Sequence, residues 1–422
     1  MAKTKSFFSR GRKVQTVSRI VSEQRAAGLI MHRAGSGDGA EWTVDGRTLK
    51  NFASCSYMGL ERHPELQRGA TRALDEYGSN FSISRIYLQC PLYNELEETL
   101  GEVMGRPTIV TPSTTVAHLA ALPVLIGDKD VVLVDQFAHA SIHMATDSVA
   151  DVPIELMRHN RMDLLEERLK IVGEGVERVW YLCDGVYSML GDYAPFRALE
   201  QLLRTYPKLH LYVDDAHAMS WLGRHGRGAA LTFLRSLDRV VVAVSLSKAF
   251  GASGGALAFA NEAQRDLVRA CGGPLMFSGP MPPAALGAGL ASAKLHLSPE
   301  FEAMQAELHD RVSCARGAAG AAGLELATDD PTPVLVLHYD NIPEAQRVVR
   351  GLRERGFFTC ISAFPAVPMN KPSVRLTISR HNSYEHIREL VACLAELAGD
   401  RSAVLAGHGH QQARRSPLGT AT

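Results

Sequence analysis

Short apolar segments rich in β-branched residues alternate with helix-length stretches through the middle of this chain. The apolar segments are residues 108–111, 131–135, 154–157, 179–184, 209–214, 240–245 and 256–260. The helix-length stretches between them include residues 116–124, 163–170 and 197–204. Parallel strands need crossover connections, which are usually helices, and their two buried faces make them apolar throughout. The alternation therefore predicts an α/β fold, with a mostly parallel sheet flanked by helices.

After Pro282 and Pro283 the pattern changes and predicts a second, smaller α+β domain. Its expected elements are a helical region at 284–322, strands at 333–338 and 375–378, and helices at 343–355 and 384–397. The predicted organisation is an N-terminal arm and helix (1–50), a large domain (51–295), a small domain (296–400) and a disordered tail (401–422). The tail is predicted to be disordered because its apolar residues show no periodicity.

Charge, cysteine usage and hydropathy exclude several classes of protein. The 422 residues include 45 Lys+Arg and 45 Asp+Glu, and this balance argues against nucleic acid as the main partner. No apolar run reaches the roughly 20 residues of a membrane span, and the N-terminus lacks a secretory signal, which favours a cytoplasmic location. The seven cysteines are widely spread and lack zinc-type spacing, so we expect reduced thiols and no metal site.

Polar residues follow four of the predicted strands, where the ligands of open parallel sheets bind. They are Ser113, Thr114 and Thr115; Asp135, His139 and Ser141; Asp214, Asp215 and His217; and Ser245, Ser247 and Lys248. Each group alone has a structural explanation, as a helix cap, a core histidine or a surface lysine.

Taken together, these groups predict a site for pyridoxal 5′-phosphate. Lys248 lies among small residues, where partial desolvation lowers the pKa of an amine and makes it nucleophilic. A helix N-terminus that carries hydroxyl groups binds phosphate, and a carboxylate such as Asp214 can pair with a protonated pyridine nitrogen.

Six motifs in order resemble the α-oxoamine synthase family of fold-type-I pyridoxal-phosphate enzymes, over about residues 45–400. The motifs are DQFAHAS, DGVYSMLGD, VDDAHAMSWLGRHGRG, SLSKAFGASGG, FSGPMPP and PAVP followed by VRLTIS. The resemblance implies an aspartate aminotransferase-like fold, with a mostly parallel seven-stranded sheet and a smaller C-terminal α+β domain. It also implies a homodimer with shared active sites.

The resemblance implies a role for each residue that matches a family motif. Lys248 would bind the cofactor covalently, Asp214 would pair with the ring nitrogen, and His217 would hydrogen-bond the ring hydroxyl. His139 would stack on the ring, and Ser188 would lie near the ring hydroxyl and the substrate.

The phosphate and the substrate have implied partners as well. The phosphate would be bound by Ser113, Thr114, Thr115 and Ser245, with Ser278 and Gly279 reaching across the dimer interface. Arg375 would bind the carboxylate of an amino acid, and Ser56 and Tyr57 would lie at the substrate entrance. Departures from the family pattern occur at Ser56, Tyr93, Thr114, His118, Asp184, Asp215, Ser220 and Gly279.

The predicted reaction is a decarboxylative Claisen condensation of a small amino acid with an acyl thioester, giving an α-amino ketone. Lys248 would act as the general base, and His139 would position the acyl group. The thioester is either acyl-CoA or an acyl carrier protein, which the basic N-terminal arm would dock. The alternatives are an aminotransferase or an amino-acid decarboxylase on the same fold, and a non-catalytic scaffold subunit, against which the presence of Lys248 counts.

Overall fold

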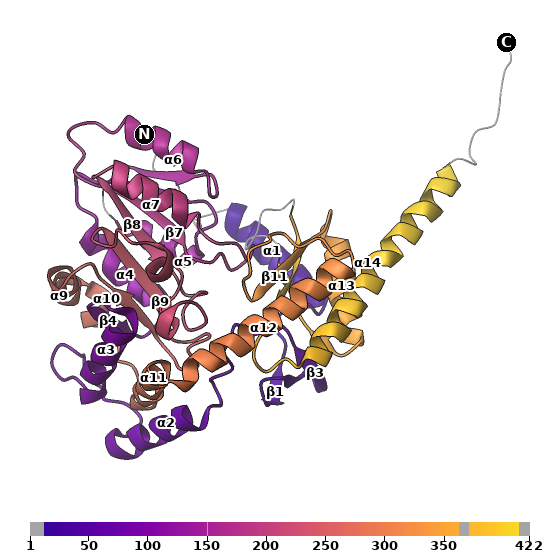
Figure 1. Ribbon diagram of the computed structural model, residues 1–422, viewed down its shortest axis with the longest axis horizontal. Helices are drawn as coiled ribbons and strands as arrows, with labels where there is room; N and C mark the ends of the chain where they lie inside the picture. The colour runs from indigo at the N-terminus through magenta and orange to yellow at the C-terminus, as the bar shows by residue number, and fades with distance from the viewer. Residues whose placement is uncertain (1–11, 150, 363–370, 413–422) are drawn as a thin grey trace, which may run out of the picture.

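The computed structural model describes residues 12–149, 151–362 and 371–412, and its large domain is built on a seven-stranded sheet (Figure 1). The strand order is β4-β10-β9-β8-β7-β5-β6, and β10 alone in this sheet is antiparallel to its neighbours. The strands are β4 (Thr108–Thr111), β5 (Val131–Asp135), β6 (Ile154–Met157), β7 (Val179–Asp184), β8 (Leu209–Asp214), β9 (Val240–Ser245) and β10 (Gly255–Ala258). The predicted mostly parallel sheet is therefore confirmed.

Both faces of this sheet are buried, which is why its strands are apolar throughout. In β7, Trp180 and Leu182 pack into the core on one face, and Tyr181 and Cys183 pack into the core on the other. Alternate residues of a strand point to opposite faces, so two helical layers are needed to cover them.

Helices on either side of the sheet supply these layers. On one face they are α4 (Thr114–Leu125), α5 (Ala140–Thr146) and α9 (Glu262–Cys271). On the other they are α3 (Pro91–Met104), α6 (Met162–Lys170), α7 (Phe196–Thr205) and α11 (Pro283–His296). The remaining helices of the large domain are α2 (Pro64–Tyr77), η1 (Arg224–Gly226), α8 (Ala230–Phe233) and α10 (Gly273–Phe277).

The long helix α12 (Glu300–Ala321) runs from the large domain to the small one (Figure 1). The small domain contains an antiparallel sheet of order β11-β14-β13. Its elements are β11 (Val334–His338), α13 (Ile342–Glu354), β12 (Phe357–Phe358), β13 (Cys360–Ser362), β14 (Ser373–Thr377) and α14 (Tyr384–Gln412). The predicted helical region at 284–322 is interrupted between α11 and α12, where Pro299 precedes the first residue of α12.

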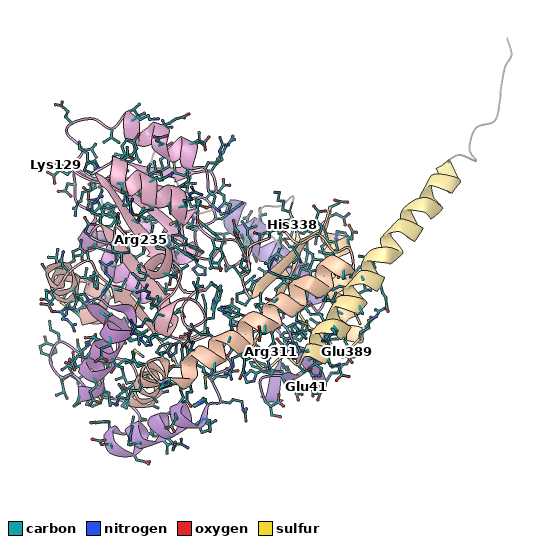
Figure 2. All side chains as sticks on the ribbon, viewed as in Figure 1. Glu41, Lys129, Arg235, Arg311, His338 and Glu389 are labelled. Carbon is teal, nitrogen blue, oxygen red and sulfur yellow. The ribbon has the colours of Figure 1, made fainter. Side chains whose placement is uncertain are left out.

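The N-terminal segment is more than the predicted arm and helix. It forms α1 (Arg12–Ala26) and the strands β1 (Ala34–Gly37), β2 (Glu41–Val44) and β3 (Arg47–Asn51). β3 pairs in parallel with β12, so this sheet joins the beginning of the chain to the small domain. Lys50 of β3 also forms an ion pair with Glu389 of α14, and Figure 2 shows Glu389 on that helix.

The prediction of a disordered tail at 401–422 is wrong for its first part, because α14 continues to Gln412 and extends away from the rest of the molecule (Figure 1). Residues 401–406 include Arg, Ala and Leu, which have high helix propensity, so the helix continues past Gly399 rather than ending there. Residues 413–422 lie outside the described part of the chain.

Within the described ranges, no helix has the length and apolarity that a membrane crossing requires. The same residues contain no group of three or more His, Cys, Asp or Glu side chains arranged to hold a metal ion.

The turn between β2 and β3 gives a test of local backbone strain. Asp45 and Gly46 have φ angles of 51° and 81°, as a two-residue hairpin turn requires, and a Cβ on Gly46 would meet nothing within 4 Å. Gly46→Ala should therefore lower the free energy of unfolding by about 1 kcal/mol through strain alone. Gly175→Ala is the control, because Gly175 is equally open but has no positive φ in that range. Equal effects of the two substitutions in chemical denaturation would contradict this account.

Candidate active site

The candidate residues converge where β5, β7, β8 and β9 end. Asp214 is the last residue of β8 and pairs in register with Asp184, the last residue of β7. Lys248 follows β9, and His139 follows β5 as the N-cap of α5. The loops after four neighbouring strands thus supply one group of side chains, as expected for a parallel sheet.

The carboxylate of Asp214 is buried but fully paired. His118 Nε2 lies 3.0 Å from Asp214 Oδ2, and the Ala216 N–H donates to Oδ1 over 3.1 Å. The other ring nitrogen of His118 lies 2.8 Å from the Tyr212 hydroxyl. Burial raises the pKa of Asp214, but His118 and the nearby Lys248 outweigh burial and lower it. Asp214 is therefore ionised, as a partner for a protonated ring nitrogen must be.

Asp184, beside it, has the opposite pKa shift. Burial and the adjacent Asp214 raise the pKa of Asp184. One of its oxygens accepts a hydrogen bond of 3.0 Å from the His139 backbone N–H. Asp184 thereby holds the start of α5, and its raised pKa disfavours a second negative charge beside Asp214.

Lys248, His217 and Tyr57 form a continuous chain of contacts. Lys248 Nζ lies 2.8 Å from His217 Nε2, and His217 Nδ1 lies 2.7 Å from the Tyr57 hydroxyl. Burial and the charges of Lys248 and Arg375 lower the pKa of His217, so its ring is neutral. When Lys248 is protonated it can only donate, so in that state Nε2 accepts and the ring proton faces Tyr57. Burial also lowers the pKa of Lys248, although Asp214 opposes it.

Arg375 reaches the same region from β14 of the small domain. Its Nε donates to the Ser188 carbonyl oxygen over 2.6 Å, and its Nη2 lies 3.5 Å from Cys55 Sγ. The guanidinium is buried, yet Cys55 and Tyr57 favour its charged form, so the pKa of Arg375 is raised. It is a fixed cation with unused donors, as a carboxylate ligand requires.

The hydroxyl-rich end of the site lies at the N-terminus of α4. Ser113 caps this helix by accepting from the Val116 N–H over 3.2 Å, and Thr114 Oγ1 donates to the Val244 carbonyl oxygen over 3.2 Å. Thr115 lies in the first turn of α4. A Cβ on Gly255 would come within 2.5 Å of the Thr114 nitrogen, so only glycine lets β10 approach this helix end so closely. Ser245 closes β9 beside it, and its hydroxyl accepts from the Ser247 N–H over 3.2 Å.

Two predicted site residues use their hydroxyl groups to contact other parts of the described chain, and a third is exposed. The Ser278 hydroxyl donates to the Pro274 carbonyl oxygen over 2.6 Å, and Gly279 is exposed. The Ser56 hydroxyl donates to Glu61. Sequence reasoning also missed two residues of the site. His118 was noted only as a departure from the family pattern, and Cys55 was one of seven scattered cysteines.

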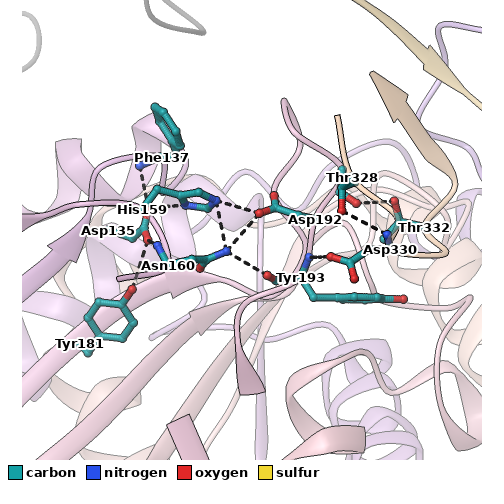
Figure 3. Close-up of polar contacts among 11 residues, drawn as sticks. Asp135, Phe137, His159, Asn160, Tyr181, Asp192, Tyr193, Thr328, Asp330 and Thr332 are labelled. Carbon is teal, nitrogen blue, oxygen red and sulfur yellow. Dashed lines mark hydrogen bonds and ion pairs between the residues drawn. The ribbon is translucent and has the colours of Figure 1, made fainter. Parts of the chain in front are cut away.

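A charged network beneath the site positions the turn that carries Ser188 (Figure 3). His159 bridges two carboxylates, with Nδ1 3.1 Å from Asp135 Oδ1 and Nε2 2.8 Å from Asp192 Oδ2. Asn160 donates to Asp192 and to the Tyr193 carbonyl oxygen, each over 3.1 Å. Because Ser188 and Asp192 belong to the same turn, this network supports the carbonyl group that holds Arg375.

Comparison with known proteins was made for the sequence and for the structure. Residues 47–413 match the family "aminotransferase class I and II". The chain is 30% identical over 381 residues to the 8-amino-7-oxononanoate synthase of Coprothermobacter proteolyticus, covering 89% of this chain and 95% of that protein. It is 33% identical over 368 residues to the enzyme of the same name from Geobacter sulfurreducens, covering 86% and 92%.

Two solved structures have the same fold. The serine palmitoyltransferase of Sphingomonas wittichii superposes with a TM-score of 0.85 at 23% identity, covering 93% of this chain and 98% of that one. The 8-amino-7-oxononanoate synthase of Francisella tularensis superposes with a TM-score of 0.70 at 21% identity, covering 84% and 99%.

The chain therefore belongs to the aminotransferase class I and II family, and within it to the α-oxoamine synthases. The predicted family and fold class are confirmed, and with them the cofactor of that family, pyridoxal 5′-phosphate. The site fits this cofactor chemically. An ionised carboxylate matches a protonated ring nitrogen, an amine of lowered pKa matches an aldehyde, and the hydroxyl-bearing start of α4 matches a phosphate.

The network around His159 predicts a loss of stability at alkaline pH. Burial lowers the pKa of His159, but Asp135 and Asp192 outweigh burial and raise it to about 9. Its stabilising contribution is complete below the unfolded-state pKa of about 6.5 and is lost as pH rises through about 9. His159→Gln should therefore lower Tm most at about pH 6, and the difference from wild type should shrink at about pH 10. A Tm difference that does not change with pH would contradict the charged state of His159.

Proposed function

We propose that this protein is a pyridoxal-phosphate-dependent acyltransferase that condenses a small amino acid with an acyl thioester and releases carbon dioxide, thiol and an α-amino ketone. The observation that carries this proposal is the placement of Lys248, whose pKa is lowered by burial, near the ionised Asp214 and the charged Arg375. The curated relatives at 30% identity or more are synthases of this reaction class.

Each of these side chains has a definite task in the proposed reaction. When bound, pyridoxal 5′-phosphate supplies an electron-poor ring that accepts the electron pair left at the substrate α-carbon. Asp214 would keep the ring nitrogen protonated. Its negative charge is stabilised by His118, and its carboxylate is buried away from water. The start of α4 and Ser245 hold the phosphate.

Lys248 Nζ has a second task as the base that removes the α-proton. Its lowered pKa leaves a larger neutral fraction of the amine near neutral pH, and His217 lies within hydrogen-bonding distance of Nζ. Arg375 orients the amino acid through its carboxylate. The Ser188 carbonyl oxygen holds the guanidinium in place by accepting a hydrogen bond from Nε. His139 is exposed at the site, and desolvation by the surrounding protein lowers its pKa, so it offers a neutral ring on which the cofactor would stack.

Removal of the lysine tests the covalent assignment. Lys248→Ala should lower kcat at least about 10³-fold, because both the covalent anchor and the base are lost. Thiol release from an acyl-CoA, measured with glycine, alanine and serine in turn, is the assay. Lys129→Ala removes an exposed lysine that pairs only with Glu177 at the surface, and its turnover should match wild type. Turnover by Lys248→Ala at the wild-type rate would refute the assignment.

The same assay separates the proposed reaction from its alternatives. Release of thiol that depends on one amino acid identifies both the condensation and its substrate. An enzyme that converts an amino acid to a keto acid without thiol release is an aminotransferase. One that releases carbon dioxide without consuming thioester is a decarboxylase, and a protein that binds no cofactor is a scaffold. The identity of the acyl donor is tested by replacing acyl-CoA with an acyl carrier protein. This test is needed because most of the proposed docking arm lies outside the described residues.

We further propose that the active unit is a homodimer, supported by an exposed apolar patch beside Ser278 and Gly279. Phe277 is 87% exposed and Tyr87 is 81% exposed, and Ile86 and Leu88 lie next to Tyr87. The Ser84 hydroxyl donates to the Met276 carbonyl oxygen over 2.5 Å and joins the two segments that form the patch. A second copy of the chain would bury these side chains and bring Ser278 and Gly279 towards a phosphate in the partner.

The dimer is tested by placing a charge in this patch. Phe277→Asp should weaken dimerisation by roughly 30-fold or more, because an unpaired carboxylate would be buried at the interface. Sedimentation over a range of protein concentrations measures the dissociation constant. Ile171→Asp alters another exposed apolar residue, outside the patch, and should leave association unchanged. A monomeric wild type with full activity would contradict the shared site.

A further inference from the structure

Cys55 is a nucleophilic group in the active site for which the proposed reaction has no use. It lies in the segment after β3, partly exposed, and its Sγ is 3.5 Å from Arg375 Nη2. The same edge of the guanidinium is also fixed by the backbone, since Nε donates to the Ser188 carbonyl oxygen over 2.6 Å. Cys55 is thus a neighbour of Arg375 whose charge can change, and Arg375 is the group proposed to bind the amino-acid carboxylate.

The ionisable groups around Cys55 come from four parts of the chain. Arg375 faces it from β14, Lys248 from the loop after β9, and Tyr57 from its own segment. Cys360 of β13 is the cross-strand partner of Arg375 and adds a second thiol near the same guanidinium. Two of these four groups are cations. Within the described chain, no carboxylate is among the groups that shift the pKa of Cys55 most strongly.

The two thiols near Arg375 differ in their ionisation. Burial raises the pKa of Cys55, but the charges of Arg375 and Lys248 and hydrogen bonds from Arg375 and Tyr57 outweigh burial and lower it. Burial raises the pKa of Cys360, and Arg375 does not overcome it. Cys55 is therefore the thiol that ionises first as pH rises.

We propose that Cys55 is a positioning residue for the amino-acid substrate: as a thiol it orients Arg375, and as a thiolate it competes with the substrate carboxylate for that guanidinium. The inference rests on the proposed function, because it assigns the carboxylate of an amino acid to Arg375. A neutral sulfur is a weak acceptor, so the positive charge of Arg375 remains available to the substrate. A thiolate in contact neutralises that charge and repels the incoming carboxylate.

The first test is the pH dependence of KM for the amino acid. Between about pH 7 and about pH 9, KM of the wild-type holoenzyme should rise about tenfold more than KM of Cys55→Ser or Cys55→Ala, which corresponds to one unit of pKa coupling. kcat should change little between the three proteins. The α-amino group of the substrate titrates in the same range, but it affects all three equally, so the difference isolates Cys55. Equal KM profiles for wild type and both variants would overturn the proposal.

Cys360→Ser is the matched control, since it removes the other thiol near Arg375. Cys360 stays protonated over most of this range, so the variant should keep the alkaline rise in KM. If Cys360→Ser lost the alkaline rise in KM and Cys55→Ala kept it, the effect would belong to Cys360. That result would overturn the proposal.

A second readout needs no turnover. Iodoacetamide alkylation of Cys55, followed by mass spectrometry as a function of pH, should give a midpoint below the ordinary thiol value of 9.0. Arg375→Gln should shift this midpoint upward by about one unit. A midpoint at or above 9.0 in wild type would refute the thiol–guanidinium pair even if Arg375→Gln does not fold. A low midpoint without any condensation would refute the proposed function and leave the pair intact.

Discussion

The buried contact between Asp214 and His118 is the interaction on which the rest of the site depends. Burial raises the pKa of a carboxylate, as it does for Asp184 beside it, whereas His118 and Lys248 lower the pKa of Asp214. His118 donates to Asp214 from the helix whose first turn carries the proposed phosphate ligands. One side chain of α4 therefore stabilises the charge of Asp214, the proposed partner of the ring nitrogen, while the start of the same helix carries the hydroxyl groups proposed to bind the phosphate.

Much of the fold could be predicted from the sequence because its strands are buried on both faces. Runs such as 179–184 and 240–245 are apolar at every position, which marks them as strands of a covered parallel sheet. The N-terminal sheet was missed because β3 is half exposed and depends on β12, about three hundred positions later in the chain. The turn at Asp45 and Gly46 was its available local signal.

The residues of the candidate site also include some that the sequence predicts and others that it does not. Lys248, Asp214 and His139 could be proposed because each lies at the end of an apolar strand or in the loop just after it, and strand ends meet at one edge of a parallel sheet. His118, Cys55 and His159 could not, since their importance comes from partners distant in sequence. A histidine inside an apolar helix and a lone cysteine carry no signal until the fold shows what lies against them.

The pairing of β3 with β12 makes the small domain discontinuous, and this affects the order in which the protein can be completed during synthesis. All seven strands of the large sheet precede residue 260, so that sheet can form while the C-terminal part is still being made. β3 must wait for residues 357–358, and Arg375 emerges later still. A nascent chain can thus have the lysine proposed to bind the cofactor in place before it has the arginine proposed to bind the substrate.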